Sequence, residues 1–321
     1  MKRLRPVLRP VLRVLVPLAL LGILWATVDG PAVIARLSQA KPEWVLAALL
    51  LVNAQTVLSA WRWSWVTMAL GAPVAPGRAV QEYYLSQLVN QTLPGGVVGD
   101  AARAMRAGDG DLKRAAFAVV IERFAGQLAL FAVLLVALSL SLLVPGGMAW
   151  PAGTGLVLIG VGCIGTALVA VFRRVRSQRA TGFVVALRQA IFDPAWRLRQ
   201  AGISGAIVLC NLGSFACAAR ATGSTLPVEA VLTLIPLILT AMLLPVSVAG
   251  WGWREGAAAA VFPLAGLSSE AGLAASVAFG IILLLASLPG IFPLLRGALP
   301  VTKPVAIRPE HPNSTKNNRR L

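Results

Sequence analysis

The chain has 321 residues, of which 57% are hydrophobic and only 13% are charged, and its net charge is +17 at pH 7. Apolar stretches long enough to cross a bilayer recur along the whole sequence, which excludes a soluble catalytic domain. The basic residues stand beside these stretches, with five before residue 14, seven arginines in 173–199 and six Lys/Arg from 296 onward. This positive-inside pattern predicts contact with lipid headgroups and no nucleic-acid partner.

The first half of the chain predicts four crossings. In chain order, we expect a crossing at 11–28, an amphipathic interfacial stretch at 31–40, a crossing at 44–70, a shorter polar helix at 79–93, and crossings at 115–144 and 155–172. Arg62, between Trp61 and Trp63, is typical of an anchor at the membrane interface.

The second half continues this pattern after a cytoplasmic, arginine-rich loop. We expect an interfacial helix at 182–192, crossings at 203–219 and 228–244, a short apolar piece at 256–267 and a last crossing at 272–295. If both termini are cytoplasmic, the number of crossings is even, so 256–267 contributes to an eighth.

The predicted fold class is therefore all-α, a polytopic transmembrane helical bundle of about seven or eight spans with two re-entrant or broken elements. Residues 1–298 form the membrane domain, and 299–321 form a disordered, basic cytoplasmic tail. The predicted location is a bacterial inner membrane.

Charges inside apolar segments are costly, so each one is a hypothesis of function. They occur at three places: Asp100, Arg103 and Arg106, then Glu122 and Arg123, then Arg254 and Glu255. Helical spacing places Arg123 with Gln127, and Glu122 with Gly126, which leaves room for a neighbouring helix. A structural ion pair that holds helices together is the alternative interpretation for Glu122.

Two breaks share one pattern, in which a proline is followed by a glycine five residues later and an arginine four residues after that. The first is Pro94, Gly99 and Arg103, the second is Pro245, Gly250 and Arg254, and no other proline fits. The match predicts an internal structural repeat. A broken helix with an arginine suits an anion such as a lipid phosphate. The alternative is a pair of ordinary surface loops with arginines facing water.

Three stretches, 88–106 (LVNQTLPGGVVGDAARAMR), 121–127 (IERFAGQ) and 245–256 (PVSVAGWGWREG), resemble the lysylphosphatidylglycerol synthase transmembrane family, also called flippase-like membrane proteins. The resemblance covers roughly residues 10–298 and implies a helical membrane domain that moves or binds lipids. It looks like the stand-alone form, without the aminoacyl transferase domain. The family's polar motif residues correspond here to Asn90, Pro94, Gly99, Asp100, Arg103, Glu122, Arg123, Arg254 and Glu255. Residues 95–99 depart from many relatives, which carry Ser or Thr ahead of paired glycines.

The leading hypothesis is a lipid translocase or lipid-binding transport protein for an anionic phospholipid, a glycolipid or a polyprenyl-phosphate-linked lipid. Its substrate-binding residues are those nine together with Gln127. Arg103 and Arg254 are expected to contact the phosphate. In one closed state, Arg254 pairs with Glu122 and Arg123 pairs with Glu255. No nucleotide-binding motif is present, so active pumping requires an ion gradient or a partner.

Two other functions remain open. An integral membrane transferase would hold a divalent metal at a close acidic pair, but the only such pair, Asp109 and Asp111, is expected to be solvated loop residues. A non-catalytic partner of a lipid-modifying enzyme is the other. The only histidine, His311, lies in the polar tail, and the cysteines lack metal-ligand spacing. We therefore predict no catalytic residues, no metal site and no cofactor, and leave the oligomeric state open.

Overall fold

The computed structural model of the chain describes residues 29–93, 97–108, 111–156, 158–160, 182–243 and 249–295, together with Gly22. Within these ranges all regular structure is helical, in agreement with the predicted fold class. The predicted crossing at 11–28, most of that at 155–172, the tail, Pro94 and Pro245 lie outside the described residues.

Among the described residues, four helices are long and apolar enough to cross a membrane. They are α3 (Pro42–Ala69), α6 (Leu112–Leu143), α9 (Arg197–Ala221) and α12 (Ser269–Ser287), the last continued by η3 (Leu288–Gly290) and α13 (Ile291–Leu295). They coincide with four of the predicted crossings. Their exposed surfaces are rich in leucine, valine and phenylalanine, as expected for helices that face lipid.

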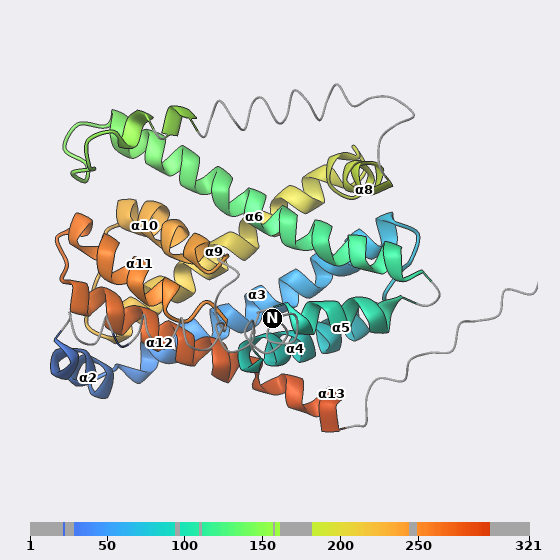
Figure 1. Cartoon of the computed structure of the whole chain (residues 1–321), viewed down its shortest axis with the longest axis horizontal. Coiled ribbons are helices and arrows are strands. Elements are labelled where there is room, and N and C mark those ends of the chain that lie inside the picture. The colour runs from blue at the N-terminus through green and yellow to red at the C-terminus, as the bar shows by residue number, and fades with distance from the viewer. Residues whose placement is uncertain are drawn as a thin grey trace, which may run out of the picture.

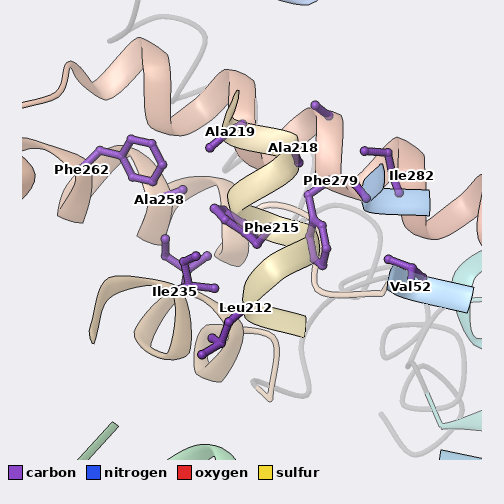
Figure 2. Close-up of a cluster of buried hydrophobic side chains, with 14 of the residues drawn as sticks. Val52, Leu212, Phe215, Ala218, Ala219, Ile235, Ala258, Phe262, Phe279 and Ile282 are labelled. Carbon is purple, nitrogen blue, oxygen red and sulfur yellow. The ribbon is translucent and has the colours of Figure 1, made fainter. Parts of the chain in front are cut away.

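Helices α3 and α9 run antiparallel side by side. The Lys41 N–H before α3 donates to the Ala221 carbonyl at the end of α9, at 3.0 Å. Near the other end, the Arg62 guanidinium of α3 donates to the Ser204 hydroxyl of α9, at 3.2 Å. Most of the larger apolar core packs around α9 and α12, where the rings of Phe215 and Phe279 lie 5.1 Å apart (Figure 2).

A helical hairpin lies between α3 and α6. Its arms are α4 (Pro76–Thr92) and α5 (Val98–Ala107), separated by 93–97. Asn90 of α4 contacts Gly99 beside the break, whereas Glu82 contacts Arg106 near the free ends of the arms. Residue numbers rise along one arm as they fall along the other, so α5 returns to the end from which α4 began (Figure 1).

A second helical hairpin lies between α9 and α12. Its arms are α10 (Val228–Ala241) and α11 (Trp253–Val261), and η2 (Phe262–Ala265) follows. Ala249, Gly250 and Gly252 all have positive φ values at the turn, 51°, 82° and 86°. Only glycine adopts this region readily, so the two glycines explain how the chain reverses direction here.

The two hairpins enter the bundle from opposite ends. Arg114, in the first turn of α6, lies 3.7 Å from the Cβ position of Gly71, so α3 ends where α6 begins, and the α4–α5 hairpin connects them at that end. Ser141, near the end of α6, contacts Glu229 at the start of α10. Helices α9, α10, α11 and α12 therefore repeat the order of α3, α4, α5 and α6, and each runs in the opposite direction to its counterpart.

Positive charge is unequal at the two ends. We call the end where α3 finishes and α6 and α9 begin the basic end. Among the described residues it carries Arg78, Arg106, Lys113, Arg114, Arg188, Arg197 and Arg199, whereas the opposite end carries Arg36, Lys41 and Arg220.

The structure corrects the prediction for 228–244. Helix α10 has 14 residues, fewer than the roughly 17 that a crossing needs. Its partner α11 returns to the same end, where Ala258 lies against Gly272 at the start of α12. Helices α10 and α11 thus form the two arms of one hairpin, and α10 is shorter than the sixth crossing predicted there.

The shorter predicted helices are confirmed in the described residues. The amphipathic stretch becomes α2 (Gly30–Ser38), which buries Val33 against α12. The predicted helix at 182–192 consists of α8 (Gly182–Leu187) and a π-helical turn, η1 (Arg188–Phe192).

Candidate functional site

The start of α5 packs closely against α4 at Gly99. A Cβ built on Gly99 would lie 2.1 Å from the Ser86 carbonyl oxygen, so no other residue fits without a shift of the backbone. The Asn90 side-chain oxygen accepts the Gly99 N–H at 2.8 Å, which satisfies one of the free donors at a helix start. This packing fixes where Asp100 and Arg103 of the next turn point.

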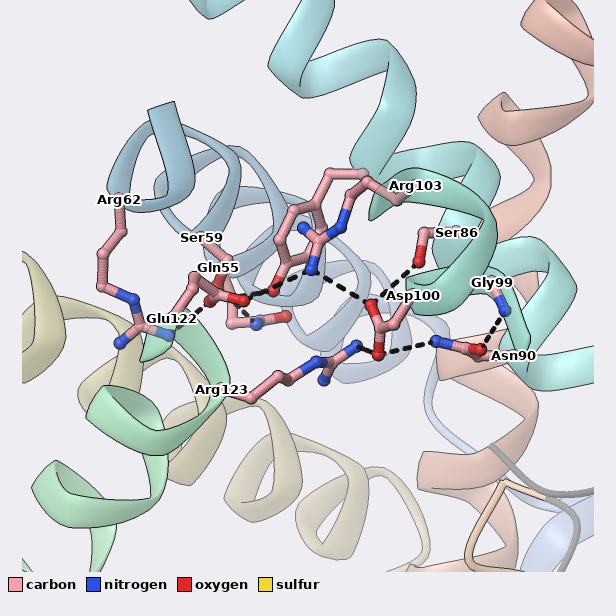
Figure 3. A network of polar contacts seen from close by, with 11 residues as sticks. Gln55, Ser59, Arg62, Ser86, Asn90, Gly99, Asp100, Arg103, Glu122 and Arg123 are labelled. Carbon is pink, nitrogen blue, oxygen red and sulfur yellow. Dashed lines mark hydrogen bonds and ion pairs between the residues drawn. The ribbon is translucent and has the colours of Figure 1, made fainter. Parts of the chain in front are cut away.

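Asp100 is held by four side chains (Figure 3). It accepts from the Ser86 hydroxyl at 3.0 Å and from the Asn90 amide at 3.3 Å, both on α4. It also forms ion pairs with Arg103 at 3.0 Å and with Arg123 of α6 at 2.8 Å. Asp100 therefore joins both arms of the hairpin to α6.

Glu122 is the second carboxylate of the network and is fully buried. Its Oε1 accepts from Arg62 of α3 at 2.7 Å and from the Tyr83 hydroxyl of α4 at 3.2 Å. Its Oε2 lies 3.4 Å from Arg103. Because its partners come from α3, α4 and α5, Glu122 does hold helices together, as the structural interpretation of this residue predicts.

Arg103 lies at the centre and is sealed from the surface. Its guanidinium stacks between the rings of Trp63 and Tyr83, 4.5 and 4.4 Å from their centroids. Its Nε and Nη1 have no hydrogen-bond partner among the described residues. This arginine supplies buried positive charge, and in this structure it cannot itself touch a ligand at the surface.

Arg123 is the arginine of the network that reaches the surface. Its side chain is 47% exposed although it belongs to α6, a membrane-crossing helix. At 1.5 Å per residue it stands about 16 Å from the start of that 32-residue helix, inside its apolar stretch. Exposed apolar side chains precede and follow it on α6 and also occur beside the hairpin break: Val120, Phe124 and Leu128 on α6, and Leu93, Val97 and Val98 at the break.

Arg62 corrects a prediction made from its tryptophan neighbours. It is 3% exposed and its side chain lies inside the bundle, whereas the side chain of an interfacial anchor would reach out to the headgroups. Gly126 makes room for it, because a Cβ there would lie 2.9 Å from the guanidinium. The space expected beside Glu122 thus exists, and the side chain of a neighbouring helix fills it.

The second hairpin has a separate network. The Arg254 guanidinium pairs with its own neighbour Glu255 at 2.5 Å and donates to the Ser276 hydroxyl of α12 at 3.0 Å. Glu255 also accepts the Gly252 N–H at 2.7 Å, which caps α11. Gly280 lets Arg254 approach α12, since a Cβ there would meet its guanidinium at 2.3 Å.

These contacts bear on the surface-loop alternative and on the pairing expected in one closed state. Arg103 and Arg254 are almost completely buried, so they do not belong to surface loops that face water. The expected pairs of Arg254 with Glu122 and of Arg123 with Glu255 are not formed in this structure, because each charge has a nearer partner within its own hairpin or on α3 and α6.

The predicted site residues therefore fall into groups. Asn90, Gly99, Asp100, Arg103, Glu122 and Arg123 lie together, whereas Arg254 and Glu255 lie in the second hairpin. Gln127 follows Arg123 by one turn, and its Oε1 is buried without a hydrogen-bond partner among the described residues.

Sequence reasoning did not assign Arg62, Trp63 or Tyr83 to the site. One signal was available for Arg62, because a charge seven residues inside a 28-residue apolar helix needs a buried partner. Nothing in the sequence indicated that Trp63 and Tyr83 would enclose Arg103.

A metal site has no support from the described residues, where no group of three or more His, Cys, Asp or Glu could hold an ion. Asp111 of the predicted loop pair caps α6 through the Arg114 N–H, at 2.9 Å, and pairs with the Arg114 side chain. Both side chains are about half exposed, as expected for solvated loop residues. Asp109 lies outside the described residues.

The sequence matches a protein family described as Lysylphosphatidylglycerol synthase TM region over residues 11–290. None of the curated proteins compared with the chain matches it. The matched range contains both hairpins and the whole ion-pair network.

Proposed function

We propose, from the premise that the chain belongs to the family of lysylphosphatidylglycerol synthase transmembrane regions, that it is a lipid translocase. The proposed substrate is an anionic phospholipid or a lipid-linked glycan, whose phosphate binds Arg123. The family relates the chain to membrane lipid handling, and the site supplies the chemistry argued below.

One observation carries the proposal: a half-exposed arginine lies within a helix that is long and apolar enough to cross a membrane, and exposed apolar side chains precede and follow it on that helix. An arginine inside a crossing helix costs several kcal/mol unless an anion or water meets it. Asp100 meets one nitrogen of Arg123, while 47% of the side chain stays exposed. A lipid offers both parts of a matching ligand. Its phosphate can bind the exposed edge of Arg123 in the fork geometry that guanidinium favours, while its acyl chains cover Val97, Val120 and Phe124.

Asp100 gives the site a way to respond to that ligand. It pairs with Arg123 at 2.8 Å, so an incoming phosphate competes with it for the same guanidinium. Asp100 belongs to the first turn of α5, and a weaker Asp100–Arg123 bond loosens the hairpin from α6. Binding is thereby linked to movement of the α4–α5 hairpin.

The inverted order of the two hairpins supports transport over simple binding. Many secondary transporters place substrate near the membrane midplane, between inverted repeats with broken helices. Here one hairpin starts from each end of the bundle. Because Lys and Arg are enriched on the cytoplasmic side of membrane proteins, we place the basic end in the cytoplasm of a bacterial inner membrane.

The test is translocation of fluorescent phosphatidylglycerol in proteoliposomes, followed by quenching of the label in the outer leaflet. Arg123→Gln should lower the rate at least about tenfold, the loss of roughly one charged hydrogen bond. Arg114→Gln is the matched control. Arg114 belongs to the same helix as Arg123, its side chain is similarly exposed, 50% against 47%, and it also pairs with an aspartate.

The control should transport at the wild-type rate. Wild-type protein that leaves phosphatidylglycerol in its original leaflet would refute the proposal and favour a non-catalytic partner of a lipid-modifying enzyme. Equal rates for Arg123→Gln and Arg114→Gln would show that the assigned arginine is wrong.

A further inference from the structure

A short helical segment lies against the side of the bundle at the basic end. We call α8 and η1 together, residues 182–192, the lid. Four of its side chains are buried in the apolar cluster that also contains Trp63 and Val66 of α3: Ala186, Leu187, Ala190 and Ile191. The ring of Phe183 packs edge-on against that of Phe117 in α6, with 5.3 Å between their centroids. The lid therefore rests on α3 and α6, beside the start of α9 (Figure 1).

The other side of the lid exposes apolar side chains. Val185 and Phe192 are 43% and 50% exposed, and Leu198, in the first turn of α9, is 79% exposed. A helix that buries one apolar face in protein and exposes another at the end of a membrane bundle suits the boundary between headgroups and acyl chains. The exposed side of the lid therefore suits contact with lipid.

The chain from the end of the lid into α9 is basic. Residues 188–199 contain one carboxylate, Asp193, against three arginines, Arg188, Arg197 and Arg199, a net charge of +2. Arg197 and Arg199 are exposed. The guanidinium of Arg199 lies over the ring of Trp196, 5.9 Å from its centroid, a combination typical of the headgroup level. The charge of this stretch complements an anionic membrane surface.

One buried polar side chain beside the lid has no partner. Gln200, in the first turn of α9, is 3% exposed, and neither its Nε2 nor its Oε1 has a hydrogen-bond partner among the described residues. Ser204, one turn later on the same face, contacts Arg62 of α3, so Gln200 faces α3 as well. The turn η1 packs against both α3 and α9 and is joined to α9 by only four residues, 193–196. The amide of Gln200 thus lies where α3, α9 and the lid meet.

The seated position of the lid therefore carries a cost. An amide that is buried without hydrogen-bond partners destabilises the state that buries it. If the lid lifts, water reaches Gln200 and this cost disappears, while the apolar contacts of the lid with α3 are lost. The two effects oppose each other, so a contribution from outside the protein decides how much of the time the lid is seated.

We infer that the lid senses the charge of the membrane surface: anionic headgroups bind Arg197 and Arg199 and hold the lid down beside Gln200, and a neutral surface lets it lift. The cytoplasmic leaflet, which the basic end faces in the proposed orientation, is the anionic one. This inference goes beyond the proposed transport, because the headgroups act here as a charged surface and not as the lipid that is moved.

Hydrogen–deuterium exchange of the whole protein in lipid nanodiscs tests the inference without requiring transport. Exchange in peptides covering 182–200 is compared in phosphatidylcholine and in discs where about a third of the lipid is phosphatidylserine or phosphatidylglycerol. We expect exchange to be about tenfold slower with either anionic lipid. Salt at about 1 M, which shortens the screening length to about 3 Å, should remove most of the difference.

Three variants separate the parts of the argument. The double variant Arg197→Gln, Arg199→Gln should exchange as fast in anionic discs as in neutral ones. Arg220→Gln is the matched control, because Arg220 is exposed at the other end of α9 and lies over Trp44 as Arg199 lies over Trp196. It should keep the wild-type response. Gln200→Leu removes the unpartnered amide and should slow exchange in neutral discs at least about fivefold.

Each result decides for or against the lid. Equal exchange in neutral and anionic discs, or faster exchange in anionic ones, overturns the inference. A response that survives loss of Arg197 and Arg199, or that occurs with only one anionic headgroup, also overturns it, since surface charge at this segment would not be the cause. Unchanged exchange in Gln200→Leu would refute the cost assigned to the amide. Charge-dependent exchange in a protein that moves no lipid supports the lid and refutes the proposed transport.

Discussion

Replacement of Glu122 by glutamine tests whether the buried network holds the bundle together. The substitution keeps the shape of the side chain but removes the charge shared by Arg62, at 2.7 Å, and Arg103, at 3.4 Å. Both guanidinium groups are almost completely buried, so water cannot replace the lost carboxylate. Removing one partner of a buried ion pair costs about 3–5 kcal/mol, and we expect Glu122→Gln to lose this much stability.

The assay is thermal denaturation in detergent micelles, followed by far-ultraviolet circular dichroism. A loss of this size corresponds to a fall in Tm of about 4–7 °C for a chain of this length. Glu43→Gln, which removes an exposed carboxylate in the first turn of α3, should change stability by less than about 0.5 kcal/mol.

A double variant separates the ion pair from the glutamine itself. The loss of unfolding free energy in the double variant Arg62→Gln, Glu122→Gln should be smaller than the sum of the two single losses by about 1–3 kcal/mol. The reason is that the second substitution removes a charge that the first had left unpaired. A Glu122→Gln protein as stable as the wild type, or losses that simply add, would refute the reasoning about buried charge.

Two further predictions concern the hairpins. Gly99→Ala should lower stability by about 1–3 kcal/mol and slow translocation, because its Cβ would lie 2.1 Å from the Ser86 carbonyl oxygen. Gly77→Ala, in open space on the same hairpin, should not, and equal melting curves for the two variants would contradict the argument. At the opposite end, the Ser141 hydroxyl and then a backbone N–H hold the pKa of Glu229 below its usual range. A lowered pKa stabilises the folded protein above the usual value of about 4.3 and ceases to do so as the pH falls through the lowered value. The difference in Tm between wild type and Glu229→Gln should therefore shrink between about pH 7 and pH 3, and a constant difference would contradict this.

Sequence alone predicted the crossing helices well because composition and length decide them. The apolar stretches at 44–70 and 115–144 needed no knowledge of neighbours, and both are helices of nearly those bounds. The stretch at 228–244 was misjudged because its composition is that of a crossing. What turns the chain back is the positive φ of residues 249, 250 and 252, and only two of these are glycines.

Sequence reasoning predicted which residues belong to the site better than it predicted the ion pairs they form. The rule that buried charge needs a partner led to Asp100, Arg103, Glu122 and Arg123, which do lie together. It could not say which carboxylate meets which arginine, since that depends on how α3 packs against α6. The same dependence explains Arg62, whose flanking tryptophans suggested an interface while its helix neighbours placed it inside.

The ion pair between Arg62 and Glu122 joins residues 60 positions apart in the chain, and this separation matters while the protein is being made. When α3 leaves the ribosome and enters the translocon, its arginine has no counter-charge, because Glu122 has not yet been synthesised. An unpaired arginine inside a crossing helix opposes insertion, by up to about 2.5–3.5 kcal/mol at the helix centre. Stable residence of α3 in the bilayer is thus completed only when α6 arrives, so the biogenesis of this protein is a concerted event between two helices and not a sequence of independent insertions.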